Sequence, residues 1–198
     1  MNAPALLIFI KNPEKGKVKT RLARDLGDDK ALQIYRALLA HTREVALSVS
    51  AERFLFYSEY VPESDDWPAS GFDKRLQKGA DLGERMYRAF VQVLERHERA
   101  VIIGSDCPQL QASIVEEAFA RLEEFPVVLG PAQDGGYYLL GLHRPEPSLF
   151  HDISWSTESV LEQTLQRVAA LGQEAFLLPR LSDIDRAADW ERYGWELG

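Results

Sequence analysis

Residues 5–10 read ALLIFI, an unbroken run of apolar side chains that ends at Lys11. A strand with one face in water alternates apolar and polar residues, so a continuous run indicates a strand buried on both faces. Such strands belong to parallel sheets that helices cover on both sides. This stretch therefore predicts an α/β protein, and it directs attention to the residues that follow the strand.

The rest of the chain alternates strands and helices in the same way. Further strands are expected at 53–58, 100–104, 126–130, 137–142 and 174–179. Apolar residues spaced three and four apart predict helices at 28–50, 81–98, 112–125 and 156–171, with others over 20–26 and near Asp185. Asp28, Asp81 and Ser156 stand where helix caps are expected. The pattern predicts a Rossmann-like, mainly parallel sheet covered by helices on both faces, in one domain spanning residues 1–198.

The composition limits the possible partners. The 198 residues carry a formal net charge of −8, which disfavours nucleic acid and membrane surfaces because both repel an acidic protein. Apolar runs stay well short of the roughly 18 residues that a membrane span needs. One cysteine, Cys107, excludes an internal disulfide, and with the short apolar N-terminal stretch it favours a cytoplasmic protein. The composition specifies no oligomeric state.

Against this acidic background, the segment after the first strand is rich in cations, namely Lys11, Lys15, Lys17, Lys19 and Arg21. In open α/β sheets, ligands bind outside the carboxyl ends of the strands. Cations beside a helix N-terminus are unfavourable unless an anion lies between them. The alternative is a charged loop in water, as most lysine-rich segments are. We favour a phosphate site that uses Lys11, Lys19 and Arg21.

Carboxylates follow other predicted strands. Asp106 comes directly after the strand at 100–104, where the sheet would fix it as a metal ligand; the alternative is a turn residue. Asp183 and Asp185 would point the same way on an extended segment and could complete the site, although Asp185 could equally cap a helix. Cations and carboxylates at one edge suit a phosphate ligand joined to the protein by Mg²⁺ or Mn²⁺. Cys107 lacks a nearby histidine and is interpreted as a small buried residue.

Two glycine-containing loops have weaker signals. Gln133-Asp134-Gly135-Gly136 separates two predicted strands, so it makes either a hairpin turn or a close backbone approach to a ligand. Residues 78–86 enter a helix whose amide end could hold an anion, or Asp81 simply caps it. The four histidines show no metal-ligand spacing, and a Gly-x-Ser-x-Gly motif is absent, which argues against hydrolases of those kinds.

The motifs together resemble a known family. The series KNP…GxxKTRL, QxGxDLGERM, GSDCPxL, GPAxDGGYYLLGL, WST and DID is similar to that of bacterial glycosyltransferase-like proteins with the nucleotide-diphospho-sugar transferase (GT-A) fold. The resemblance covers nearly the whole chain. More distantly, the chain resembles phospholactate guanylyltransferases and molybdopterin-guanine transferases.

The resemblance implies roles for particular residues. Asp106 matches the metal-binding Asp after the central strand, and Asp185, with Asp183 as the other candidate, matches the second metal carboxylate. The triphosphate-handling segment corresponds to Lys11, Lys19 and Arg21. We assign Gly83 and Ser105 to nucleotide binding as well, and the acceptor side to Gly135, Gly136, Trp155 and Ser156. The G-G-x-G-x-R loop of many nucleotidyltransferases is missing.

The leading expectation is a metal-dependent glycosyl transfer from a nucleoside-diphosphate sugar to a small acceptor. Asp134 is the candidate base that deprotonates the acceptor hydroxyl, and the metal would neutralise charge on the leaving diphosphate. An alternative is nucleotidyl transfer from a nucleoside triphosphate to a phosphorylated small acid, which releases pyrophosphate. A nucleotide-binding protein without catalysis is the third hypothesis.

Overall fold

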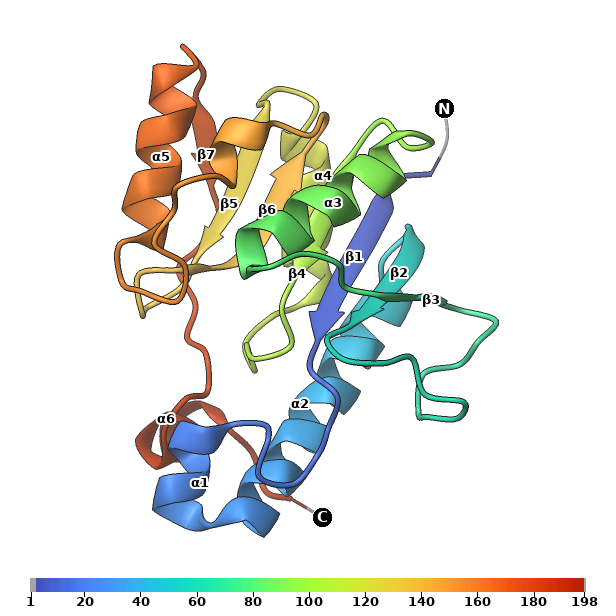
Figure 1. Cartoon of the computed structure of the whole chain (residues 1–198), viewed down its shortest axis with the longest axis vertical. Coiled ribbons are helices and arrows are strands. Elements are labelled where there is room, and N and C mark those ends of the chain that lie inside the picture. Colours follow the sequence, from blue (N-terminus) through green and yellow to red (C-terminus); the bar gives the residue numbers. More distant parts are fainter. Residues whose placement is uncertain (1–2, 198) are drawn as a thin grey trace.

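The computed structural model describes residues 3–197, and these form a seven-stranded sheet in the order β3-β2-β1-β4-β6-β5-β7 (Figure 1). Neighbouring strands are parallel except at β6, which runs antiparallel to both β4 and β5. The mainly parallel sheet is thus confirmed. The strands are β1 (Ala5–Ile10), β2 (Glu52–Tyr57), β3 (Asp73–Leu76), β4 (Ala100–Ile103), β5 (Val127–Pro131), β6 (Tyr137–Leu142) and β7 (Ala175–Leu177).

Helices cover both faces of the sheet, as expected. On β1, Leu6 and Ile8 pack into a core with α2 (Asp28–Ser48) and α4 (Ala112–Arg121). Leu7, between them, points to the other face, into a core with α3 (Leu82–Leu94) and α5 (Val160–Ala170). All three side chains are fully buried, which explains why this strand is apolar throughout.

A third, smaller core lies beyond the carboxyl ends of the strands. Helices α1 (Thr20–Leu26) and α6 (Ala187–Tyr193) lie there beside the first half of α2 (Figure 1). Leu22, Ile34 and Ile184 are completely buried between them. This packing holds the start of α1 beside the segment that precedes α6, and both segments carry predicted site residues.

Some local expectations were wrong. Strand β3 was not expected; three of its four residues are charged, and all four are exposed or only partly buried at the sheet edge. Ser156 does not cap a helix, because the chain turns there with φ of 64° and α5 begins at Val160. Asp28 is not a cap either, since Gly27 precedes the first turn of α2.

The two remaining expected caps had opposite outcomes. Asp81 does cap α3, because its side chain accepts a hydrogen bond from the Glu84 amide. Asp185 does not cap α6, where the carboxylate of Asp189 instead accepts from the Asp185 and Arg186 amides. A short 3₁₀ turn, η1 (Pro147–Leu149), precedes α5. Within residues 3–197, the helices are all too short or too polar to cross a membrane.

Candidate functional site

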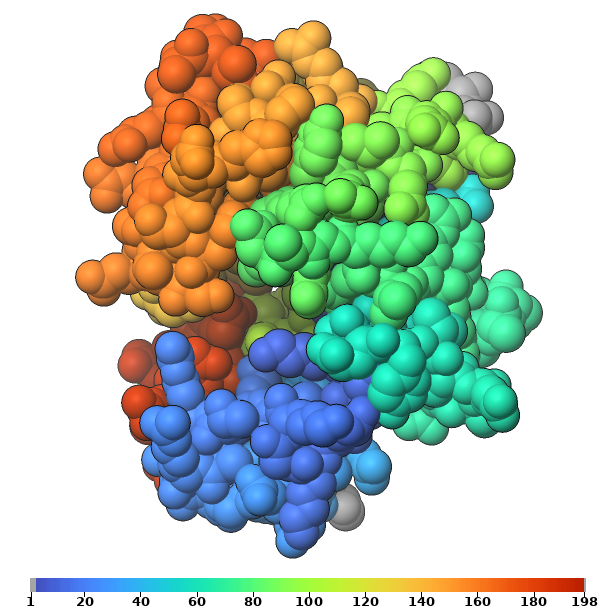
Figure 2. All heavy atoms as spheres, viewed as in Figure 1, coloured from blue at the N-terminus to red at the C-terminus, as the bar shows by residue number. Residues whose placement is uncertain are grey.

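The predicted site residues gather at the carboxyl edge of the sheet. They lie between the sheet and the small core that α1 and α6 form with the first half of α2. Figure 2 shows the molecule hollowed there, between α1, α3 and the segment before α5. The β5–β6 hairpin turn opens at the same edge, because β6 begins where its antiparallel neighbours end. Cations from the first loop and carboxylates from three other loops therefore face one cleft.

Lys19 is the cation that enters this cleft most deeply. Its Nζ lies 2.8 Å from Asp106 Oδ1 and donates to the Ile184 carbonyl oxygen at 2.6 Å. Its side chain is only 5% exposed. The backbone of Lys19 is left-handed, with φ of 49°, a conformation that is costly for a residue with a Cβ. Strain of this kind persists only where the surroundings over-determine it, and it is common at functional sites.

The segment between β7 and α6 brings the other two carboxylates to the cleft. It crosses the ends of β5 and β4, with the Leu181 amide bonded to the Pro131 carbonyl and the Ile184 amide bonded to the Asp106 carbonyl at 2.9 Å. Gln109 also accepts from the Ser182 amide. These bonds place Asp183 beside Asp106 and leave Asp185 further out.

Asp183 is a buried carboxylate of the cleft with a raised pKa. Burial raises its pKa to about 7, and repulsion by Asp106 and Asp134 adds to this while Lys19 opposes it. Asp106 and Asp134 therefore lie near enough to Asp183 to repel its charged form. Within residues 3–197, however, the structure does not bring three acidic, histidine or cysteine side chains close enough to enclose an ion.

The donor set nevertheless fits the expected metal in its chemistry. Asp106, Asp134 and Asp183 offer only oxygen atoms, the ligands of Mg²⁺ and Mn²⁺ rather than of softer metals. Burial, together with the charges of Asp106 and Asp134, raises the pKa of Asp183, so a bound cation would favour the charged form of this carboxylate. Asp106 and Asp183 would hold the ion, and the expected role of Asp185, which lies further out and pairs with Arg21, stays a prediction.

The remaining cations that follow β1 lie in three different surroundings. Arg21, in the first turn of α1, pairs with Asp185 at 3.0 Å near the rim of the cleft. Lys15 and Lys17 pair with Asp29 and Glu14 on the exposed surface, so for these two the charged loop in water is the better description. Lys11 is exposed at the end of β1.

Tyr35 is a site residue that the sequence analysis missed. Its hydroxyl donates to the Lys11 carbonyl, accepts from the Lys11 amide at 2.9 Å and lies 3.4 Å from Ser105 Oγ. Burial, with the nearby Asp106 charge, raises the pKa of this phenol well above its usual range. Tyr35 thus links the two loops that follow β1 and β4. Its place on the apolar stripe of α2 gave no signal of this role.

Residues 133–136 form a hairpin turn between β5 and β6, which was one of the two structures expected for this glycine-containing loop. Asp134 is exposed, and its Oδ1 accepts from the Gly136 amide at 2.9 Å. Gly135 has φ of +90°, and a Cβ there would fall 2.0 Å from the Glu158 carbonyl oxygen. The glycine is therefore required by the turn and by close packing on the segment before α5. Substrate contact by Gly135 and Gly136 stays a prediction.

Gly83 and Trp155, which are far apart in sequence, meet at one flank of the cleft. A Cβ on Gly83 would fall 2.3 Å from Trp155 Nε1 and 2.5 Å from the Phe150 carbonyl oxygen. The absent side chain is explained by this packing at the start of α3, and nucleotide binding by Gly83 stays a prediction. Tyr137 packs edge-on against the same indole. Ser156 is exposed beside it.

Cys107, next to Asp106, is a buried thiol. Its side chain is almost fully enclosed, and burial raises its pKa to about 12, with the charge of Asp183 adding to the effect. A thiol with this pKa is not a nucleophile near neutral pH. The interpretation of Cys107 as a small core residue is confirmed.

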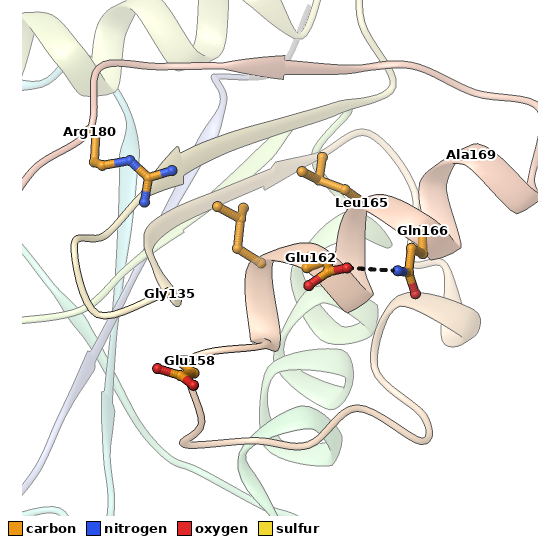
Figure 3. Close-up of a pocket in the computed structure, with 8 residues that line it drawn as sticks. Gly135, Glu158, Glu162, Leu165, Gln166, Ala169 and Arg180 are labelled. Atoms are coloured by element: carbon orange, nitrogen blue, oxygen red, sulfur yellow. Dashed lines mark hydrogen bonds between the residues drawn. The ribbon is translucent and has the colours of Figure 1, made fainter.

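A separate pocket of about 520 Å³ lies on the outer side of the Asp134 turn (Figure 3). Leu161, Leu165 and Ala169 of α5 form its apolar wall, with Gly135 and Arg180 at one end. Arg180 donates to the Ala132 carbonyl and so fixes the base of the turn. The candidate metal ligands and cleft cations do not line this pocket, so we assign the cleft and not this pocket to the site.

The sheet order, the antiparallel β6 and the site at the carboxyl edge define the fold of nucleotide-diphospho-sugar transferases, which nucleotidyltransferases share. Residues 38–157 match the family model described as "Uncharacterized protein conserved in bacteria (DUF2064)", and the chain belongs to this family. The match includes Asp106 and Asp134 but neither Lys19 nor Asp183. No curated protein matches the chain.

Solved structures support the same fold. A "putative nucleotide-diphospho-sugar transferase" from Desulfovibrio desulfuricans G20 is 32% identical, with a TM-score of 0.85 over 94% of this chain and 84% of that chain. The inositol-1-phosphate CTP transferase from T. maritima is 16% identical, with a TM-score of 0.61 over 95% and 91%. CMP:2-keto-3-deoxy-manno-octonic acid synthetase, complexed with CTP, is 13% identical, with a TM-score of 0.59 over 96% of each chain.

Proposed function

We propose that this protein is a divalent-metal-dependent transferase that uses a nucleotide-activated donor, with glycosyl transfer from a nucleoside-diphosphate sugar to a small acceptor as the leading reaction. The observation that carries the proposal is the crowding of Asp106, Asp134 and Asp183 beside a buried ammonium at the carboxyl edge. The carboxylates could bind a metal ion, and the cations beside them could bind phosphates. A nucleotide whose phosphates carry a metal ion would use both groups.

In this proposal the chain's own residues bind and orient the donor. Lys11 and Arg21, both exposed at the cleft, contact phosphate oxygens, with Lys19 between them. Tyr35 holds the Lys11 backbone and Ser105 in place, so that the two loops approach the ligand together. Mg²⁺ or Mn²⁺ held by Asp106 and Asp183 would supply positive charge at the leaving diphosphate.

Asp134 is the candidate base on the acceptor side. Its carboxylate is exposed at the tip of the hairpin turn, and the bond from the Gly136 amide fixes its direction. An acceptor hydroxyl within hydrogen-bond reach would pass its proton to this oxygen as its own oxygen attacks the sugar. Trp155 would form an apolar wall for the acceptor at the other flank.

The relatives support the class of reaction. The protein that shares 32% identity is named for nucleotide-diphospho-sugar transfer, which favours the glycosyl reaction. A fold neighbour, Rv0371c from Mycobacterium tuberculosis H37Rv, is known as a complex with manganese, which supports Mn²⁺ as the first ion to try.

Nucleotidyl transfer from a nucleoside triphosphate is the second candidate. The observation that favours it is the number of fold neighbours named for CTP or cytidylyl transfer, among them the two CTP-dependent proteins above. Both reactions would use the same cleft, and only the products differ.

A two-stage experiment tests the proposal. Thermal shift with nucleotides and nucleotide sugars, with and without Mn²⁺, first identifies the donor; a ligand at about 100 times its Kd adds roughly 2.7 kcal/mol of stability. Turnover with an acceptor panel then separates the candidates, because a free nucleoside diphosphate supports glycosyl transfer and pyrophosphate supports nucleotidyl transfer. Binding without either product would contradict both.

A further inference from the structure

Lys19 places an ammonium where the candidate metal site needs its cation. Its Nζ contacts Asp106 Oδ1 at 2.8 Å and the Ile184 carbonyl oxygen at 2.6 Å. The Asp183 carboxyl also senses this positive charge. Carboxylate and carbonyl oxygens that converge on one position are the ligands that a hard divalent cation takes. A lysine and a metal ion would therefore compete for the same oxygen atoms.

The position of Lys19 is a specific arrangement rather than a chance surface contact. Its side chain is 5% exposed, whereas those of Lys15 and Lys17 on the same loop are 56% and 69% exposed. The backbone of Lys19 is also left-handed, a conformation that a residue with a Cβ keeps only where its surroundings over-determine it.

We infer that Lys19 is a built-in counterion that occupies the cation position of the cleft until the phosphates of a donor arrive. The inference rests on the proposed function, because it assumes that nucleotide and metal share this cleft. Phosphate oxygens offer the ammonium new partners, and its departure leaves Asp106 open to the ion. Nucleotide then strengthens metal binding and metal strengthens nucleotide binding by the same factor, since the coupling of two sites is reciprocal. Metal alone has to displace the lysine and binds weakly.

Removal of the ammonium tests this competition. Lys19→Met keeps most of the length and apolar volume of the side chain and deletes its charge. We expect this variant to bind Mn²⁺ without nucleotide roughly tenfold more tightly than the parent, a change of about 1.4 kcal/mol. Free Mn²⁺ is measured by electron paramagnetic resonance during a titration. Lys17→Met is the matched control, because Lys17 lies on the same loop but pairs with Glu14 at the surface.

The same titration decides against the inference if Lys19→Met binds Mn²⁺ no more tightly than the parent and Lys17→Met. Asp106→Asn separates the two proposals. If this variant abolishes the Mn²⁺ response while Lys19→Met behaves as the parent, the metal site stands and only the counterion role fails. If Asp106→Asn binds Mn²⁺ as the parent does, the proposed site itself is wrong.

A measurement on the unaltered protein avoids any folding defect of the variant. An amine-reactive label, read by peptide mass spectrometry, reports the accessibility of each lysine. Because Lys19 is buried in the ion pair, we expect slow labelling without ligand and clearly faster labelling at saturating Mg²⁺, which expels the ammonium. Lys17 should label equally in both conditions. Unchanged labelling of Lys19 at saturating Mg²⁺ would overturn the inference.

Discussion

Gly83 lies directly beneath the indole of Trp155, so close that a Cβ at residue 83 would fall 2.3 Å from Trp155 Nε1. Gly83 belongs to the first turn of α3, and Trp155 to the segment before α5. This contact closes one flank of the cleft. It brings together the Gly83 and Trp155 motifs, which are far apart in the sequence. A single methyl group added at residue 83 would disturb the packing of both.

Gly83→Ala should therefore destabilise the protein by about 1–3 kcal/mol, the usual cost of an overpacked position. Its free energy of unfolding is measured in urea, with tryptophan fluorescence as the signal. Gly104→Ala is the control, because no atom would lie within 4 Å of a Cβ at that position. Equal stability of the two variants would show that Trp155 moves aside at no cost.

Asp106→Asn should eliminate the Mn²⁺-dependent gain in nucleotide affinity while the fold survives. The amide keeps the shape of the side chain but removes the charge that a divalent cation requires. Nucleotide affinity is measured by calorimetry with and without Mn²⁺. Asp29→Asn, which removes an exposed carboxylate paired with Lys15, should leave the metal response unchanged. A parent-like response in Asp106→Asn would make this residue a turn residue only.

The raised pKa of Asp183 predicts a pH-dependent stability. Between about pH 4 and pH 7, folded Asp183 keeps a proton that it loses in the unfolded chain, because its pKa rises from 3.8 to about 7 on folding. The free energy of unfolding should thus fall as pH increases through this range. Each pKa unit corresponds to about 1.4 kcal/mol, so the whole effect is at most about 4 kcal/mol.

Asp183→Asn should remove this slope. Without metal, the variant should be more stable than the parent near pH 8 and should differ little from it near pH 4. Urea unfolding in a chelator, repeated over this pH range, measures the difference. Parallel stability profiles of the parent and the variant would contradict the raised pKa.

Arg21→Ala should weaken nucleotide binding roughly tenfold or more, since a hydrogen bond to a charged group contributes about 1.5–3 kcal/mol. Its stability should change little, because Arg21 and Asp185 form a largely exposed ion pair. Lys17→Ala is the matched control on the same loop. If both variants bind nucleotide alike, phosphate contact by Arg21 is ruled out.

Tyr35→Phe should lower both stability and nucleotide affinity, since the buried Tyr35 hydroxyl bonds the Lys11 backbone and lies near Ser105. The lost hydrogen bonds should cost about 1 kcal/mol of stability. Tyr87→Phe, on the opposite face of the sheet, is the control, because the Tyr87 hydroxyl forms no hydrogen bond within residues 3–197. Unfolding and calorimetry on both variants decide whether Tyr35 positions the loops, and unchanged affinity would contradict that role.

The sheet could be predicted from the sequence because its central strands are buried on both faces and are therefore apolar throughout. The short edge strand β3 could not, since three residues of Asp73–Leu76 are charged and the strand gains its order from pairing with β2. The cap at Asp81 follows a local rule, whereas the start of α5 depends on a turn at 154–157 that local spacing does not specify.

Residues of the candidate site could be located from the sequence where a preceding strand determines their position. Asp106 could be located because it directly follows the buried strand β4, and Asp183 because it lies on the segment after β7, at the same edge. The contact between Lys19 and Asp106 could not, because it depends on a left-handed backbone at a non-glycine residue. Tyr35 was missed because its hydroxyl is directed by tertiary packing and not by any sequence pattern.

The segment from Leu178 to Ile184 has a consequence for the time at which the cleft forms. It supplies Asp183 and the carbonyl that holds Lys19, and it attaches to β5 and to Asp106 through its own backbone amides. A chain growing on the ribosome makes Lys19 early and this segment late. Until residues 178–184 have emerged, Lys19 lacks the Ile184 carbonyl as a partner, and Asp183 is not yet present beside Asp106. The nascent protein can therefore form at most the Lys19–Asp106 pair before the rest of the charge cluster has been made.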